Sequence, residues 1–187
     1  EFKTGSLLLI VPKNWREPEN DLLKKHEAWI YKKHSEITKA LSGVKQKTLN
    51  RGRSEDAFKA YVRQHASKYF GELKVSARAL RFRQMKSKWA SCTSKMITIN
   101  TLLRFLPARL INYVLYHEIV HLKERKHNKR FWHLVEKNFK NIQSKEKDLM
   151  SYWFLIQKKV RGVDMFTAKE KKNLIQAGGV VSTHFSI

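Results

Sequence analysis

The sequence predicts an α+β fold in which a small mixed sheet packs on one long helix, with additional helices around it. Two stretches predict the sheet. In residues 77–85, Leu80 and Phe82 alternate with arginines, so one side would face the core, and residues 96–99 form a further strand-like run. Residues 113–122 predict the helix because they are apolar on almost every face, as is typical of a helix inside a core. We expect the two strands to form a hairpin-like pair directly before this helix.

One strand and two helices are predicted before this region. Residues 7–11 form an apolar run stopped by a proline, which is typical of a buried strand. A helical period then runs from about residue 17 to Gly43. Ser54 suits the N-cap of a second helix, and Gly71 is placed to end it.

Turn and cap signals define the elements around the long helix. Residues 93–95 indicate a turn, and Asn100 can cap a short helical turn. Pro107 suits the first position of the long helix, and Asn128 would cap the next one. The core faces of that helix and of one more after it are predicted to consist of Phe131, Val135, Phe139, Ile142, Met150, Trp153, Phe154 and Ile156.

Length and composition indicate a folded, strongly basic protein. The 187 residues suffice for one good core with a small appendage, and contents of 42% hydrophobic and 11% aromatic residues exclude a disordered chain. Lysine and arginine number 39 against 16 acidic residues, a formal net charge of +23 at pH 7. This imbalance predicts a polyanionic partner such as nucleic acid, although basic residues spread along the chain would also serve solubility.

The single cysteine, Cys92, excludes an internal disulfide and predicts a reducing, cytoplasmic location. No apolar run approaches the roughly 20 residues that a membrane span needs, and no secretory signal is recognisable. We therefore expect no membrane partner, and we make no prediction for the oligomeric state.

His117 and His121 lie four residues apart in the predicted helix and bracket Glu118. A helix turns about 100° per residue, so both rings project from one face and can reach one metal ion. This is the H-E-x-x-H pattern of zinc hydrolases, in which two imidazoles hold zinc and the carboxylate acts as general base. A lone buried histidine is more often a hydrogen-bonded core residue, but two at this spacing in an apolar helix favour a metal site.

The third ligand has two candidates, His127 and Glu136. In a continuous helix His127 would point about 120° away from His121, so this ligand requires a turn after Leu122, where the apolar pattern fails. Glu136, on the following helix, would complete the zinc site as a carboxylate does in other proteases. The cap signal at Asn128 favours His127.

Four blocks of sequence, in order, resemble the YgjP-like metallopeptidase family. They are M-K-S-K-W-A-S-C at 85–92, I-T-I-N-T-L-L at 97–103, Y-V-L-Y-H-E-I-V-H-L at 113–122 and H-N-K-R-F-W at 127–132. The resemblance covers most of the chain from about residue 54 to 153. Ala90, Val120 and Asn128 depart from the family pattern, which has Gly, usually Ala, and Ser there. None of these departures touches a ligand or the base.

The resemblance implies a small zincin-like α+β domain related to SprT- and Spartan-type proteases. It implies one zinc ion per chain, held by His117, His121 and His127, with Glu118 as the base. Three neutral imidazoles leave a fourth position for water, whose pKa zinc lowers toward about 7. Glu118 would take the water's proton as it attacks a carbonyl and would pass that proton to the departing amine. We therefore predict a zinc metallopeptidase acting on protein or peptide.

We divide the chain into three parts. Residues 1–45 would hold an N-terminal strand and helix packing on the core, residues 46–157 the catalytic domain, and residues 158–187 a C-terminal tail. Residues 180–187 alternate like a strand after a Gly-Gly pair, so the tail would be regulatory if it lay along the strand at 96–99. A tail that is simply packed or disordered is the simpler account.

Substrate binding is assigned to two groups of residues. The strand at 96–99 is expected at the sheet edge beside the metal, where main-chain hydrogen bonds would hold an extended substrate. Basic residues around the site would favour anionic or nucleic-acid-associated substrates. The residues predicted to contact substrate are Ile97, Thr98, Ile99, Arg83, Lys88 and Arg130.

Two other functions remain open at this point. A metal hydroxide also attacks phosphorus, so a zinc-dependent nucleotide phosphohydrolase is one alternative. A nucleic-acid-binding module with vestigial activity is the other, and the high positive charge favours it.

Overall fold

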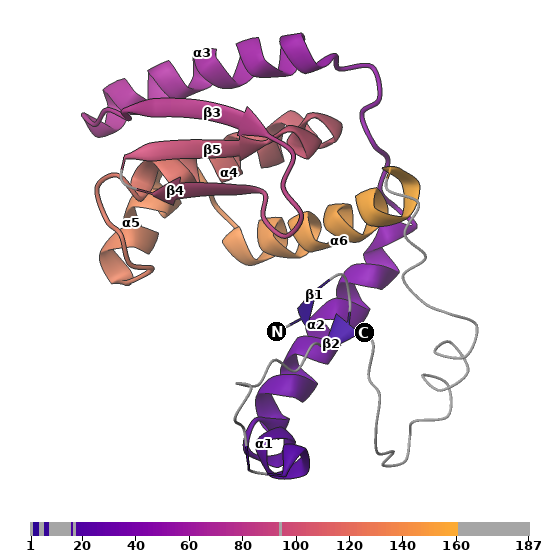
Figure 1. The fold of residues 1–187 in the computed structure, drawn as a ribbon. Coiled ribbons are helices and arrows are strands. Elements are labelled where there is room, and N and C mark those ends of the chain that lie inside the picture. The colour runs from indigo at the N-terminus through magenta and orange to yellow at the C-terminus, as the bar shows by residue number, and fades with distance from the viewer. Residues whose placement is uncertain (1, 4–5, 8–15, 17, 94, 161–187) are drawn as a thin grey trace. The chain divides into compact units, whose positions relative to one another are not determined.

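The computed structural model describes residues 2–3, 6–7, 16, 18–93 and 95–160 (Figure 1). The described residues divide into two compact units. Thr48–Leu149 form one, and the residues up to Lys47 together with those from Met150 onward form the other. No described helix combines the length and hydropathy that crossing a bilayer requires.

A three-stranded sheet forms one layer of the Thr48–Leu149 unit. Its strands are β3 (Ala79–Arg83), β4 (Ala90–Thr93) and β5 (Met96–Asn100), in the order β3-β5-β4 (Figure 1). β5 runs parallel to β3 and antiparallel to β4. The expected hairpin of residues 77–85 with 96–99 is therefore wrong. Parallel strands cannot be joined by a tight turn, and the hairpin partner of β5 is β4.

β5 lies at the centre of this sheet. Ile97 and Ile99 are 0% exposed, and the register places them beside Leu80 and Phe82 of β3. The expectation that residues 96–99 form an edge strand is wrong, because β5 has a hydrogen-bonded neighbour on each side. The edge on the side away from β3 is β4.

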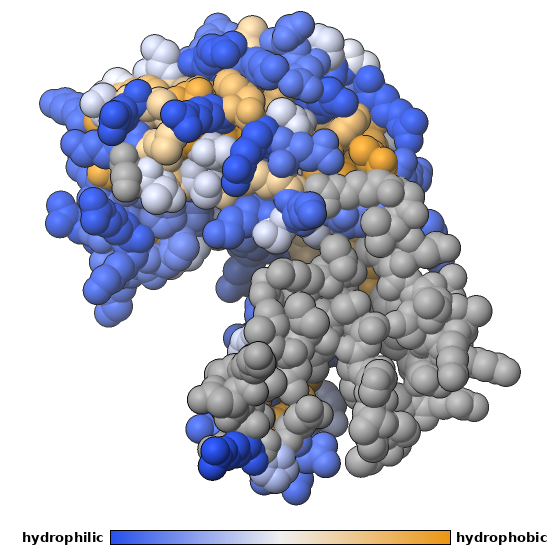
Figure 2. Space-filling view, viewed as in Figure 1, coloured by the Kyte–Doolittle hydropathy of each residue, from blue (hydrophilic) through white to orange (hydrophobic). Residues whose placement is uncertain are grey.

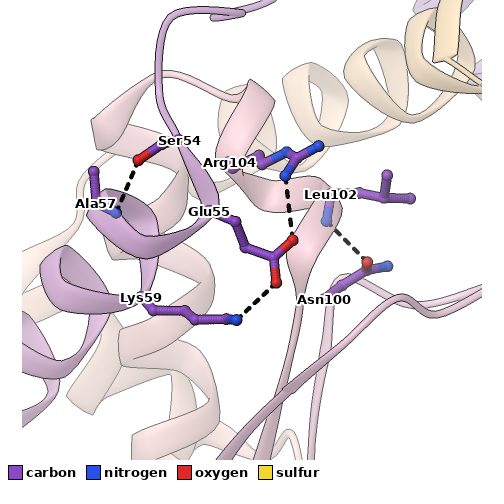
Figure 3. A network of polar contacts seen from close by, with 7 residues as sticks. All are labelled: Ser54, Glu55, Ala57, Lys59, Asn100, Leu102 and Arg104. Atoms are coloured by element: carbon purple, nitrogen blue, oxygen red, sulfur yellow. Dashed lines mark hydrogen bonds and ion pairs between the residues drawn. The ribbon is translucent and has the colours of Figure 1, made fainter.

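Helix α3 (Glu55–Leu73) confirms the predicted cap at Ser54, whose hydroxyl accepts a hydrogen bond from the Ala57 N–H at 3.2 Å (Figure 3). The prediction that Gly71 ends the helix is wrong. The helix continues until Leu73 is buried, and Lys74 ends it in the left-handed conformation with φ 52°. Burial of one more apolar side chain thus outweighs the stop signal of the glycine.

The remaining caps of this unit agree with the sequence. The Asn100 side chain caps the short 3-10 helix η1 (Thr101–Phe105) by accepting from the Leu102 N–H, and Pro107 is the N-cap of α4 (Ala108–Val120), one residue before the first helical position predicted for it. Asn128 caps α5 (Lys129–Asn138) by accepting from the Phe131 N–H at 3.0 Å. α4 packs against α3, β4, β5 and α5, and the last helix among the described residues, α6, spans Ile142–Val160.

The second unit contains short strands and helices. β1 (Phe2–Lys3) pairs antiparallel with β2 (Ser6–Leu7), and most of the strand predicted at 7–11 lies outside the described residues. The single helix predicted from about residue 17 is wrong, because α1 (Glu19–Lys25) and α2 (Glu27–Val44) are separated at His26, whose backbone is not helical. A small core joins α2 to the second half of α6. It contains Ile37, Ala40, Leu41, Val44, Met150, Trp153 and Phe154.

Asn100 connects three segments of the Thr48–Leu149 unit. Its side chain is 0% exposed, and its amide nitrogen donates to the carbonyl oxygens of Met85 at 3.1 Å and Lys88 at 2.7 Å. Its carbonyl oxygen accepts from the Leu102 N–H at 3.1 Å (Figure 3). One side chain therefore joins the loop between β3 and β4 to the end of β5 and the start of η1.

We expect Asn100→Ala to lower the free energy of unfolding by about 2–4 kcal/mol, because buried carbonyl and N–H groups lose their partners. Urea unfolding followed by circular dichroism measures the change. Asn138→Ala is the matched control, since that exposed amide donates to Glu72 at 3.0 Å and its loss should cost about 0.5 kcal/mol or less. Equal stability of the two variants would contradict the structural role of Asn100.

Candidate metal centre and active site

Helix α4 brings His117 and His121 to one side of the molecule. The helix ends at Val120, but His121 keeps right-handed helical backbone angles (φ −62°, ψ −19°), and its N–H bonds to the carbonyl of His117 at 3.4 Å. The one-turn relation of the two histidines is therefore preserved, and their ring centroids lie 5.1 Å apart.

The chain turns after His121 and places His127 against the same two rings. Nε2 of His117 and Nε2 of His127 lie 3.0 Å apart. One nitrogen from each of the three histidines lies within 4.8 Å of the others, and no other such group of metal-ligand side chains occurs in the described part of the chain. Glu136, the alternative third ligand, is exposed on α5 and is not part of this group.

The histidines are in a state that suits metal binding. Burial, followed by the neighbouring His121 and His127, lowers the pKa of His117 to about 3, so its ring is neutral. Burial also lowers the pKa of His121, and its Nδ1 lies 3.1 Å from the carbonyl oxygen of Glu124. A proton on Nδ1 would donate to that carbonyl and leave Nε2 free to bind a metal.

The donor set fits zinc. Zinc takes neutral imidazole nitrogens at about 2.0–2.1 Å, and tetrahedral angles then place two such nitrogens about 3.3 Å apart. The 3.0 Å separation between Nε2 of His117 and Nε2 of His127 is close to this value, and every pair of donor nitrogens in the group lies within 4.8 Å. Three ligands of this kind are typical of a catalytic site, which keeps one position for water.

Glu118 lies beside this cluster and is 9% exposed. Burial raises the pKa of its carboxyl to about 7, while the positive charge of Lys88 and a hydrogen bond from the Cys92 N–H act in the opposite direction. A carboxyl group that gains and loses a proton near neutral pH is suited to general acid–base catalysis. The Cys92 contact also shows that the edge strand β4 runs next to Glu118.

Phe131 and Trp132 are parts of the site that the sequence analysis did not assign to it. Phe131 is 0% exposed, and its ring centroid lies 4.8, 4.6 and 4.6 Å from those of His117, His121 and His127. Trp132 stacks on His127 with centroids 5.6 Å apart and an interplanar angle of 23°. The apolar pattern of the sequence predicts Phe131 only as a core residue. Phe131 follows His127 by four residues and lies in the first turn of a helix capped by Asn128. This spacing is the sequence feature that could have placed Phe131 near the histidines.

The other predicted substrate residues are distributed differently. Ile97 and Ile99 are fully buried on β5, and Thr98 is half-buried on the opposite face of the sheet. Arg130 is exposed in the first turn of α5, next to the histidine cluster in sequence. Arg83 and Lys88 are also exposed, and they line one cavity together.

Comparisons with known proteins find a family profile and solved structures. The profile of the YgjP-like metallopeptidase domain matches residues 45–152, which is more than half of the chain. Two solved structures of metallopeptidase zymogens are similar to part of it. Abylysin of Pyrococcus abyssi is 26% identical, with 54% of this chain and 95% of that chain covered and a TM-score of 0.43. Jannalysin of Methanocaldococcus jannaschii is 21% identical, with 52% and 95% covered and a TM-score of 0.43. No curated protein matches the chain.

The fold and the matched profile define a zincin-like metallopeptidase, a metal-dependent hydrolase. Within that class the chain belongs to the YgjP-like family.

We expect Phe131→Leu to weaken zinc binding about tenfold or more, because the new side chain keeps the site apolar but loses the aromatic ring that contacts three imidazoles, two of them edge to face. Competition with a chromogenic chelator measures the zinc affinity. Phe58→Leu is the matched control. Phe58 is also 0% exposed, and its ring contact is with Phe82 and not with the histidines. A similar loss of zinc affinity in both variants would show that Phe131 acts through general stability alone.

Proposed function

We propose that the protein is a zinc endopeptidase in which His117, His121 and His127 hold one zinc ion and Glu118 is the general base. The observation that carries this proposal is the convergence of three histidine rings beside the buried carboxyl group of Glu118. Membership of a metallopeptidase family favours peptide bonds over the nucleotide phosphates of the alternative phosphohydrolase.

The chemistry divides between the ion and the chain. When bound, zinc supplies a Lewis acid that polarises a carbonyl oxygen and makes water acidic near neutral pH. Glu118 would accept the proton of the attacking water on its carboxylate and then donate it to the nitrogen of the departing amine. Burial raises the pKa of Glu118 and so favours proton uptake by its carboxylate, while a bound zinc ion would act in the opposite direction.

The substrate would lie along β4 and not along β5. The Asn100 N–H donates to the carbonyl of Trp89, so these two residues form a hydrogen-bonded pair between the strands. Pairs alternate along antiparallel strands, and the N–H and C=O groups of Ala90 and Cys92 must therefore point away from β5. The outward N–H of Cys92 donates to Glu118, so an extended peptide that pairs with the Ala90 groups of this edge would pass directly by the base.

The charge of the chain supports an anionic substrate or a substrate bound to nucleic acid. Figure 2 shows hydrophilic residues around the outline of the visible face of the Thr48–Leu149 unit, with apolar residues between them. The exposed basic residues that surround His127 in sequence are Lys123, Arg125, Lys126, Lys129 and Arg130. Such a rim attracts polyanions by long-range electrostatics. The cytoplasmic location stays a prediction, and the proposed regulatory tail at 158–187 lies almost entirely outside the described residues.

His127→Ala is expected to reduce bound zinc from about one ion per chain to a small fraction of that value, because two imidazoles alone bind zinc weakly. Elemental analysis of the purified protein after dialysis measures the stoichiometry. His133→Ala, on the exposed side of α5, should leave one zinc per chain. Full zinc content in the His127 variant would assign the third ligand to another group.

Glu118→Gln is expected to lower kcat by about 10³-fold while zinc remains bound, since the amide keeps the size of the side chain but cannot accept the proton. Hydrolysis of a quenched fluorescent casein, with zinc content determined on the same sample, measures both quantities. Glu136→Gln serves as the control because that carboxylate is exposed and outside the cluster. Unchanged turnover in the Glu118 variant would remove this residue from the mechanism.

A further inference from the structure

A cavity of about 400 Å³ lies at the end of β3, and none of the three histidines lines it. Arg83 of β3, the loop that follows it and Ser91 of β4 line the cavity. Successive side chains of a strand point to opposite faces of the sheet. The register pairs Ser91 with Thr98, and Thr98 lies on the face opposite to that of Ile97 and Ile99. The strand residues of the cavity therefore belong to the sheet face opposite the buried core.

The cavity is strongly cationic. Arg83, Lys86 and Lys88 contribute to its lining, and no acidic residue does. All three side chains are exposed. In the described ranges of the chain, none of them forms an ion pair with a carboxylate. Arg83 and Lys86 are therefore available to an anionic group of suitable size, while the positive charge of Lys88 also acts on Glu118.

The loop that carries these cations is held in place. The second and fifth residues after β3, Met85 and Lys88, have their carbonyl oxygens bonded to the buried amide of Asn100. Met85 itself is 8% exposed and anchors the loop by its side chain. A fixed backbone lowers the entropy that ligand binding would otherwise cost.

The cavity lies next to the proposed base. On β4, Ser91 lines the cavity, and the next residue, Cys92, donates its N–H to Glu118. Neighbouring residues of a strand are about 3.3 Å apart. A peptide bound along the β4 edge would direct alternate side chains to the sheet face where the cavity lies, at positions close to the bond being cleaved.

We propose that the cavity formed by Arg83, Lys86, Lys88 and Ser91 binds the acidic side chain of a peptide substrate, a glutamate or aspartate near the scissile bond. This inference rests on the proposed peptidase function and names its substrate class. Arg and Lys donate charge-assisted hydrogen bonds to a carboxylate, and the Ser91 hydroxyl adds a neutral donor.

A peptide carboxylate fits this cavity better than a nucleic acid does. A nucleic-acid strand gains its affinity from many phosphate contacts spread along a surface. Here three cations surround one recess, and that recess adjoins the edge at which a peptide would pair. A single acidic side chain can fill such a recess while the peptide backbone stays on β4.

The test uses the zinc-loaded full chain and quenched fluorescent peptides that differ only by glutamate or glutamine at one position, scanned through the positions around the cleaved bond. We expect one position at which glutamate raises kcat/KM about fivefold or more over glutamine, the effect of one or two partly exposed ion pairs. In the double variant Arg83→Glu, Lys86→Glu this ratio should fall below one.

The matched control is the double variant Arg51→Glu, Lys137→Glu, which makes the same change in net charge at exposed positions outside the cavity. Its glutamate-to-glutamine ratio should equal that of the wild type. A wild-type ratio near one at every position would overturn the proposal. So would a ratio that changes equally in both double variants, because the effect would then come from net charge.

A binding measurement separates this proposal from the peptidase proposal. The zinc-loaded Glu118→Gln variant is titrated with fluorescein-labelled glutamate and glutamine peptides, and anisotropy reports affinity without turnover. A glutamate preference that is lost on adding the Arg83→Glu, Lys86→Glu changes supports the cavity even if no peptide is cleaved. Two results together would overturn the cavity proposal in favour of a nucleic-acid site. The glutamate and glutamine peptides would bind with equal affinity, and the Arg83→Glu, Lys86→Glu changes would release a labelled single-stranded oligonucleotide.

Discussion

The proposed metal centre depends on where helix α4 stops. The helix carries two histidines on one face, but a continuous helix would turn the third away from them. The end of α4 at Val120, directly before His121, and the turn that follows allow His127 to approach His117 to within 3.0 Å between ring nitrogens. The Asn128 cap and the fully buried Phe131 then fix the start of α5, so the turn is held from both ends. Loss of either end would separate the three rings.

Local signals in the sequence predicted much of the fold. Ser54, Asn100 and Asn128 each cap the element that follows them, because a short polar side chain before an apolar period satisfies the first free N–H groups. The sequence did not predict β4, which is short and consists mainly of small residues with no apolar alternation. It also did not predict the parallel pairing of β3 with β5, since strand order is set by contacts between residues that are distant in the chain. The break at His26 has no glycine or proline to mark it.

Some features of the candidate site are likewise set by residues close together in the sequence, whereas others depend on the whole fold. The spacing of His117, Glu118 and His121 is a helical pattern, and it is readable because the apolar residues around it require a buried helix. Assigning the substrate edge to β5 failed because an edge position is a property of the whole sheet. Likewise, the contact of Phe131 with all three imidazoles cannot be distinguished from ordinary core packing without the fold.

The buried amide of Asn100 has a chemical consequence. Both of its ends are in use, with the nitrogen donating to two carbonyl oxygens and the oxygen accepting from an N–H. Spontaneous deamidation, which converts asparagine to aspartate with almost no change of shape, would set a carboxylate oxygen against the carbonyls of Met85 and Lys88. Loss of this one amide would therefore loosen the loop that carries Lys86 and Lys88, a segment that contributes none of the three imidazoles.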